Sequence, residues 1–267
     1  MRRAVVALFF GIVFAIVSAA SASGCPIPLH ANRTSFSTTV HIGADGPFRF
    51  LVDTGTTITV IDRTLAKRIG VQPSGTTVAV SSTTGALEVA EAEVRDFRAG
   101  TVTVASAKVL IADLPRFANH GHIDGILGMS FFTGRSMLLD LRRRCLELDV
   151  APIAGSTLDA HEVAGRVAIE IEGLNLILDS GSSFAVLTSA RARALAVESG
   201  TAELTSAGGG RRTTAVTLPR LELGGLTLHN VTAAVVLRDD SRSDGLLPIT
   251  LFDRVYIAAD RNEVVLR

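Results

Sequence analysis

The sequence of 267 residues contains no tryptophan and one tyrosine, and its aromatic content is only 5%. Its 26 basic residues are balanced by 26 acidic residues, so the formal net charge is zero. A nucleic-acid-binding protein needs a basic face or aromatic side chains on which bases can stack, and this chain offers neither. We therefore expect no nucleic-acid partner.

Several chemical signatures are also missing. The sequence contains no Gly-x-Ser-x-Gly elbow, no P-loop and no dinucleotide fingerprint, which argues against a serine hydrolase of that type and against a nucleotide site. His120 and His122 flank a glycine, but two ligands without a third do not hold zinc. We expect neither a metal nor a cofactor.

The first residues are typical of an export signal. Arg2 and Arg3 precede an apolar run over residues 4–20 and small residues at 21–24, as in secretory signal peptides. We predict that residues 1–24 are a signal peptide and that the mature protein is exported. A retained membrane helix is the alternative, although the run is close to the lower length limit for a membrane span.

Cysteine is scarce, and Cys25 allows two interpretations. Residues 22–25 resemble a bacterial lipoprotein box, in which Cys25 would be acylated and would attach the protein to the membrane. Alternatively, Cys25 pairs with Cys145 in an oxidising compartment. Both interpretations agree with export, so we expect a protein that is periplasmic or anchored to the membrane by a lipid.

Hydrophobic residues make up 47% of the chain, enough for a substantial core. They form short apolar runs between Gly, Asp, Asn and Ser turns, a pattern that predicts an all-β fold. Short helices are expected over 63–69, capped by Asp62, and over 190–198, capped by Thr188 or Ser189. The glycines at 208–210 predict a hairpin tip.

Two segments nearly repeat each other: Phe-Leu-Val-Asp-Thr-Gly-Thr-Thr at 50–57 and Leu-Ile-Leu-Asp-Ser-Gly-Ser-Ser at 176–183. Each apolar run ends in an aspartate, Asp53 or Asp179. A buried carboxylate is costly unless something satisfies it, so two of them in matching contexts are expected to meet. Carboxyl groups about 3 Å apart share a proton and become one acid and one base. We predict a catalytic pair that splits an amide with water.

The repeat continues along the chain. Asp124-Gly-Ile-Leu is echoed by Asp244-Gly-Leu-Leu, and Asp140 is echoed by Asp260 at the same interval. A repeat of this length indicates a duplicated domain and not a solenoid unit. We predict an N-terminal lobe over 25–150, a linker over 151–165 and a C-terminal lobe over 166–267.

With these motifs the chain resembles the aspartic peptidases of the pepsin and retropepsin clan, as a bacterial-type exported member. The resemblance rests on Asp53-Thr54-Gly55 with Ile-Leu-Gly at 126–128, and on Asp179-Ser180-Gly181 with Leu-Leu-Pro at 246–248. Pro248 stands where the family usually has glycine. The resemblance implies a bilobal pepsin-like fold made of two retropepsin-like β-barrel halves with short helices.

The resemblance also implies supporting roles at each aspartate. The hydroxyl residue after the aspartate hydrogen-bonds across the lobe junction, the glycine lets the backbone approach the other lobe, and the next hydroxyl donates to the carboxylate of its own loop. Because donation to the charged form lowers the pKa of a carboxyl group, we expect an acidic pH optimum. These residues are Thr54, Gly55, Thr56, Ser180, Gly181 and Ser182.

A flap is expected to close over the cleft. The candidate residues are Ser82, Thr83, Thr84 and Gly85. Pepsin-like enzymes usually carry a tyrosine on the flap, whereas the single tyrosine of this chain is Tyr256.

The function expected from the resemblance is that of an endopeptidase acting on peptide or unfolded protein. Because both halves lie in one chain, we expect a monomer. The alternative is a peptide-binding or scaffolding module that retains the fold without cleaving, an interpretation supported by Pro248 and by the missing flap tyrosine.

Overall fold

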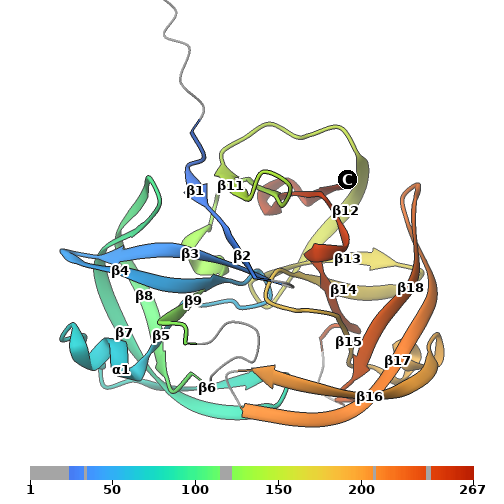
Figure 1. The fold of residues 1–267 in the computed structure, drawn as a ribbon, viewed down its shortest axis with the longest axis horizontal. Coiled ribbons are helices and arrows are strands. Elements are labelled where there is room, and N and C mark those ends of the chain that lie inside the picture. Colours follow the sequence, from blue (N-terminus) through green and yellow to red (C-terminus); the bar gives the residue numbers. More distant parts are fainter. Residues whose placement is uncertain (1–23, 33–34, 115–121, 207–208, 239–241) are drawn as a thin grey trace, which may run out of the picture.

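The computed structural model describes residues 24–32, 35–114, 122–206, 209–238 and 242–267 (Figure 1). Within these ranges the chain is mostly β-strand, with two short α-helices and three 3₁₀ turns. This confirms the predicted all-β fold with two halves. Most of the predicted signal peptide, together with His120 and Gly208, lies outside the described residues.

The first half is an eight-stranded sheet of order β2-β3-β4-β9-β5-β8-β7-β6. An additional pairing between β3 and β7 closes this sheet into a barrel, around buried side chains such as Phe50, Phe97 and Leu127. Its strands are β2 (His30–Asn32), β3 (Ser35–Ile42), β4 (Asp45–Val52), β5 (Val60–Asp62), β6 (Thr77–Ser82), β7 (Gly85–Ala99), β8 (Val102–Ala112) and β9 (Gly125–Leu127).

The second half repeats this topology. Its strand order β13-β14-β19-β15-β18-β17-β16 matches β3-β4-β9-β5-β8-β7-β6 strand for strand, as a duplicated domain requires. The strands are β13 (Arg166–Ile171), β14 (Leu174–Asp179), β15 (Ala185–Leu187), β16 (Val197–Ser206), β17 (Gly209–Leu223), β18 (Leu226–Val235) and β19 (Gly245–Pro248).

A set of six strands joins the two halves, in the order β1-β11-β10-β20-β21-β12 (Figure 1). They are β1 (Ile27–Pro28), β10 (Met137–Asp140), β11 (Cys145–Leu148), β12 (Ser156–Val163), β20 (Arg254–Ala258) and β21 (Glu263–Leu266). The segment 151–165, expected to be a linker, therefore contains a strand. Its alternation of inward Leu158 and Ala160 with outward Asp159 is a strand pattern that small flanking residues obscure in the sequence.

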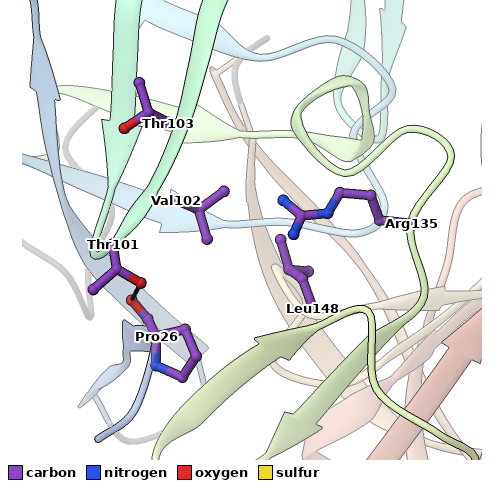
Figure 2. A pocket seen from close by; sticks show the side chains of 6 residues that line it. All are labelled: Pro26, Thr101, Val102, Thr103, Arg135 and Leu148. Carbon is purple, nitrogen blue, oxygen red and sulfur yellow. Dashed lines mark hydrogen bonds between the residues drawn. The ribbon is translucent and has the colours of Figure 1, made fainter.

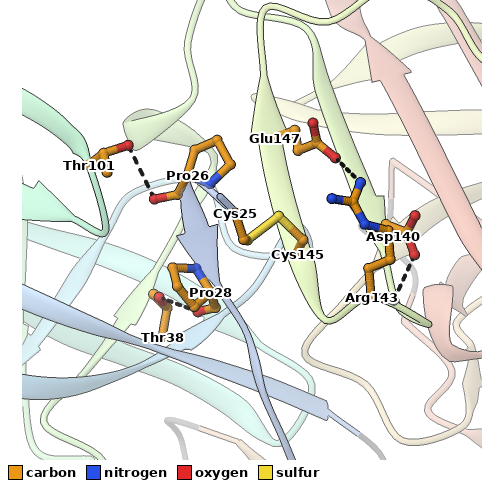
Figure 3. Close-up of a disulfide and its surroundings, with 9 residues drawn as sticks. All are labelled: Cys25, Pro26, Pro28, Thr38, Thr101, Asp140, Arg143, Cys145 and Glu147. Atoms are coloured by element: carbon orange, nitrogen blue, oxygen red, sulfur yellow. Dashed lines mark hydrogen bonds and ion pairs between the residues drawn. A yellow bond between two sulfur atoms is a disulfide. The ribbon is translucent and has the colours of Figure 1, made fainter. Parts of the chain in front are cut away.

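Cys25 and Cys145 form a disulfide, with their Cα atoms 5.6 Å apart (Figure 3). The bond ties the beginning of the described chain to β11. Of the two interpretations open for Cys25, the structure contains the disulfide, and the sulfur that acylation would modify is occupied by this bond.

The backbone of Pro26 next to the disulfide is held by the β7–β8 turn, because the Thr101 amide donates to the Pro26 carbonyl at 2.8 Å. A shallow pocket lies at this junction (Figure 2). It contains neither aspartate of the repeated motifs; its lining residues are Pro26, Thr101, Val102, Thr103, Arg135 and Leu148.

Both predicted helices form, and each begins with a side-chain cap. Asp62 accepts the Thr64 amide at 2.8 Å before α1 (Arg63–Arg68), and Ser189 accepts the Ala192 amide at 3.1 Å before α2 (Ala190–Ala194). The helix predicted over 190–198 is shorter because Val197 already belongs to β16 and pairs with β17. Among the described residues, no helix is long and apolar enough to cross a membrane.

Candidate active site

Each repeated aspartate lies at the carboxyl end of a central strand. Asp53 directly follows β4, which lies between β3 and β9, and Asp179 ends β14, which lies between β13 and β19. Strands covered on both faces have continuous apolar sequences, which explains the run before each aspartate. The fold thus delivers both carboxyl groups from the interior of their sheets to the junction of the lobes.

Asp124 and Asp244 fix the strands that carry the two aspartates. Asp124 accepts the backbone amide of Arg49 in β4 at 2.9 Å, and Asp244 accepts the amide of Asn175 in β14 at 2.9 Å. The sequence shows this pair as a repeated Asp-Gly-apolar-apolar segment without revealing its role. The role follows from the contact: each carboxylate holds a central strand in place.

The lobes are joined directly beneath the carboxyl groups by crossed hydrogen bonds. The Thr54 hydroxyl donates to the Leu178 carbonyl at 2.7 Å and accepts the Ser180 amide at 3.0 Å. The Ser180 hydroxyl donates to the Val52 carbonyl at 2.8 Å and accepts the Thr54 amide at 2.9 Å. Both hydroxyl residues are buried, so water does not compete with these four bonds. They hold the two aspartate loops face to face.

Each carboxyl group occupies space left free by the glycine of the other loop. A Cβ built on Gly55 would lie 2.6 Å from Cγ of Asp179, and a Cβ built on Gly181 would lie 2.6 Å from Cγ of Asp53. The two carboxyl groups are also close enough for the charge of Asp179 to act on Asp53. The two aspartates that the repeat predicts to meet are therefore in contact.

The loops supply hydrogen bonds to both carboxyl groups. Asp53 accepts the Gly55 amide at 2.8 Å and the Thr56 hydroxyl at 2.7 Å. Asp179 accepts the Gly181 amide at 2.7 Å and the Ser182 hydroxyl at 2.8 Å. The hydroxyl donors implied by the resemblance are thus in place in both loops, and together these bonds fix the orientation of both carboxyl planes.

Burial raises the pKa of Asp53 well above its ordinary value, and the charge of Asp179 raises it further. Hydrogen bonds from Thr56 and from the Gly55 amide act in the opposite direction but are outweighed. A carboxyl group in this position keeps a proton at pH values where an exposed aspartate has lost it. The site therefore contains a proton donor and an acceptor side by side.

Pro248, the departure from the family pattern, is matched by a second difference. In the first half, the Gly128 amide donates to the buried Thr59 hydroxyl at 3.2 Å. The corresponding residues of the second half are Pro248, which has no N–H, and Ala185, which has no hydroxyl. Donor and acceptor are lost together, so no buried polar group is left without a partner at this position.

Two hairpin tips meet at the lobe junction, not one. The residues expected to form a flap lie at the turn between β6 and β7, and the Thr84 hydroxyl is 2.6 Å from the Ser206 hydroxyl at the end of β16. Arg238 of the second half also donates to the Ser82 carbonyl at 2.9 Å. Figure 1 shows the ends of both hairpins converging opposite the six strands that join the halves.

The second hairpin, formed by β16 and β17, contains Gly209 and Gly210 of the predicted glycine-rich tip, whose position at the lobe junction was not predicted. The duplication contains the signal, because β16 ends 124 residues after β6, close to the 126 residues that separate Asp179 from Asp53. Tyr256 is not near either tip: it is buried in β20 of the joining strands, where Arg261 donates to its hydroxyl.

Among the described residues, no group of three or more His, Cys, Asp and Glu side chains is arranged to hold a metal ion. His122 lies on an exposed segment, with its Nε2 3.6 Å from Asp124. The two aspartates are held by hydrogen bonds from loop amides and hydroxyls, and these donors suit carboxyl groups that exchange protons with water.

Comparison with known families agrees with this geometry. The family model described as "Aspartyl protease" matches residues 38–131 and 163–250, which together cover more than half of the chain. Each matched segment contains one of the two aspartate loops. No curated protein matches the sequence.

Proposed function

Since the chain belongs to the aspartyl protease family, we propose that it is an exported aspartic endopeptidase that hydrolyses peptide bonds with a water activated by Asp53 and Asp179. The observation that carries the proposal is the placement of each carboxyl group over the glycine of the opposite loop. Binding a peptide does not require two acidic groups in contact, whereas acid and base catalysis by one pair does.

The reaction we propose uses one shared proton. Asp53 begins protonated and Asp179 ionised; Asp179 takes a proton from water as the oxygen attacks the scissile carbonyl, and Asp53 gives its proton to the carbonyl oxygen. In the resulting diol, Asp179 protonates the amide nitrogen while Asp53 takes a proton from a hydroxyl group. The C–N bond breaks, an acid and an amine leave, and the pair returns to its starting state without a covalent intermediate.

The hairpin tips support this reaction by covering the pair. The contact between Thr84 and Ser206 and the hydrogen bond from Arg238 to Ser82 join the tips across the lobes. In this proposal the joined tips limit the access of bulk water to a bound substrate, and polar interactions strengthen when water is excluded. A substrate enters only when the tips separate. Extended peptide or unfolded protein fits this requirement, because its chain can lie across the junction of the lobes.

The disulfide supports export, because such bonds persist in oxidising compartments such as the periplasm. The protein acts as a monomer in this proposal, since one chain supplies both aspartates and both hairpins.

The test is incubation of the purified protein with an unfolded protein between about pH 3 and pH 7, a range that spans carboxyl titration. We expect fragments from the wild type and none from Asp53→Asn or Asp179→Asn. Asp45→Asn, at the exposed first residue of β4, is the matched control and should cleave like the wild type.

The non-cleaving module is the outcome that would replace the proposal. It would be supported if the wild type bound peptide but left every substrate intact across this pH range. Two features of the sequence favoured such a module. Pro248 no longer supports it, because the facing residue Ala185 has no hydroxyl group that needs an N–H donor. The missing flap tyrosine is the argument that remains.

A further inference from the structure

The two catalytic aspartates face different neighbours across their sheets. The register of β13 and β14 pairs Ala168 with Ile177, and two residues further it places Arg166 opposite Asp179. In the first half, Ser37 pairs with Leu51, and the same step places Ser35 opposite Asp53. Residues opposite each other share a face of the sheet, with Cβ atoms about 4.5–5.5 Å apart.

The backbone at Arg166 is held by both lobes. It follows a two-residue turn in which Ala164 and Gly165 have φ of 52° and 75°. The hydroxyl of Thr57, next to the Asp53 loop, donates to the Ala164 carbonyl at 2.7 Å, and Nε of Arg166 donates to the Val163 carbonyl at 3.3 Å. Together with the register of β13 and β14, these bonds put Arg166 on the sheet face of Asp179, where its charge interacts with both Asp179 and Asp53.

The charge of Arg166 is only partly compensated. Burial lowers its pKa, attraction by Asp179 and Asp53 raises it, and repulsion by Arg238 lowers it. Within the described parts of the chain, no carboxylate lies at ion-pair distance from Arg166, and a pair that shares one proton offers a single negative charge to two arginines. A half-buried cation in this environment is stabilised by any carboxylate that enters the cleft.

We propose that Arg166 makes the enzyme select substrates with an acidic side chain, aspartate or glutamate, next to the scissile bond. This proposal rests on the proposed peptidase function and names its substrate class. A guanidinium group binds a carboxylate through two parallel N–H donors, which gives geometric specificity as well as attraction. The neutral Ser35 at the equivalent place of the first half confines this selection to one side of the cleaved bond.

The test compares peptides that differ only by glutamate, glutamine or lysine at each position flanking a cleaved bond. At about pH 5.5 free glutamate is ionised, and the wild type should show kcat/KM roughly tenfold higher for glutamate than for glutamine at one position. Arg166→Gln should abolish the preference, Arg166→Lys should keep part of it, and Arg166→Glu should favour lysine. Arg220→Gln, an exposed arginine of β17, should retain the wild-type ratio.

Equal losses for the glutamate and glutamine peptides in Arg166→Gln would overturn the proposal, because they would mean that Arg166 acts only on the aspartate pair. Binding of the same peptides, measured by fluorescence anisotropy with the wild type, Asp53→Asn and Arg166→Gln, separates this proposal from the peptidase function. Absence of cleavage would refute the function, whereas equal binding of glutamate and glutamine peptides by the wild type would refute the role of Arg166. Circular dichroism shows whether each variant is folded, and Arg166→Lys provides a conservative substitution.

Discussion

Cγ of Asp179 lies 2.6 Å from the position that a Cβ of Gly55 would occupy, and Asp53 stands in the same relation to Gly181. Cβ atoms essentially never come within 3.0 Å of a heavy atom outside their own residue and its two chain neighbours. The glycines of the Asp-Thr/Ser-Gly motifs are therefore required by the opposite lobe, which puts a carboxyl group where any side chain would begin. This explains why the two motifs match although they lie in different halves.

The first prediction follows from this contact. Gly55→Ala forces the carboxyl group of Asp179 out of position, and a displacement of about 1 Å at reacting groups costs roughly a hundredfold in rate. We expect kcat to fall at least that far, measured with a peptide substrate. Thr103→Ala, at an exposed position of β8, is the control and should be unaffected. Near-normal activity in Gly55→Ala would contradict the arrangement of the pair.

A second prediction concerns pH. The Thr56 hydroxyl stabilises the ionised form of Asp53 and lowers its pKa, so Thr56→Ala should raise that pKa. Because Asp53 acts as the proton donor in the proposed reaction, activity is lost as pH rises through its pKa. The alkaline limb of the kcat/KM profile should move upward by roughly one pH unit. Thr56→Ser, which keeps the hydroxyl, should leave the limb in place; the same profile for Thr56→Ala and the wild type would count against the assignment.

A third prediction tests the relationship between Pro248 and Ala185. Ala185→Thr buries a hydroxyl without a donor, and Pro248→Gly buries an N–H without an acceptor; each should lower the free energy of unfolding by about 1–3 kcal/mol. The double variant recreates the pair found in the first half as Thr59 and Gly128. Urea unfolding should therefore show a double variant more stable than the sum of the single effects by roughly 1–2 kcal/mol. Strict additivity would show that the two positions are independent.

The fourth prediction concerns Asp244 and acid stability. Burial alone would raise its pKa, but hydrogen bonds from Arg191, from Ser189 and from the Asn175 amide lower it from the ordinary 3.8 to about 2. Because the pKa is lower in the folded state, this stabilisation is complete above about pH 4 and is lost as pH falls through about 2. Asp244→Asn should lower Tm near neutral pH, and the difference from the wild type should shrink between about pH 4 and pH 2.

Thermal unfolding followed by circular dichroism measures this difference. The exposed Asp159 on β12 offers a control, since Asp159→Asn should change Tm little at any pH. A Tm difference for Asp244→Asn that stayed constant down to about pH 2 would rule out the ionised carboxylate as its source.

The sequence was sufficient to predict that the two aspartates meet, which hydroxyl groups bind them, and the bilobal all-β fold. These features depend on short contiguous motifs. An apolar strand followed by an aspartate and a small hydroxyl residue can be recognised in the sequence without knowledge of tertiary contacts. The helix caps at Asp62 and Ser189 were predictable for the same reason, because a cap depends on residues within one turn.

Features that depend on contacts between residues far apart in the chain could not be predicted in this way. The contact between Thr84 and Ser206 joins two tips of small residues that have no chemical signature, and the place of Arg166 depends on a strand register. The sequence also left acylation of Cys25 and a disulfide with Cys145 as alternatives, because the sequence alone does not show whether two cysteines so far apart in the chain come together. β12 was missed because its alternation is short and begins among small residues.

The unequal neighbours of the two aspartates have a consequence for how a polypeptide lies in the site. A cleft built from equivalent halves accepts a chain in either N-to-C direction, because rotation by half a turn presents the same groups again. Continued by two residues, the strand registers put Arg166 opposite one aspartate and Ser35 opposite the other, so the rotated orientation meets a different charge. In the proposed function, the duplication supplies the catalytic pair, and the divergence of its copies makes the two orientations of a bound substrate chain unequal.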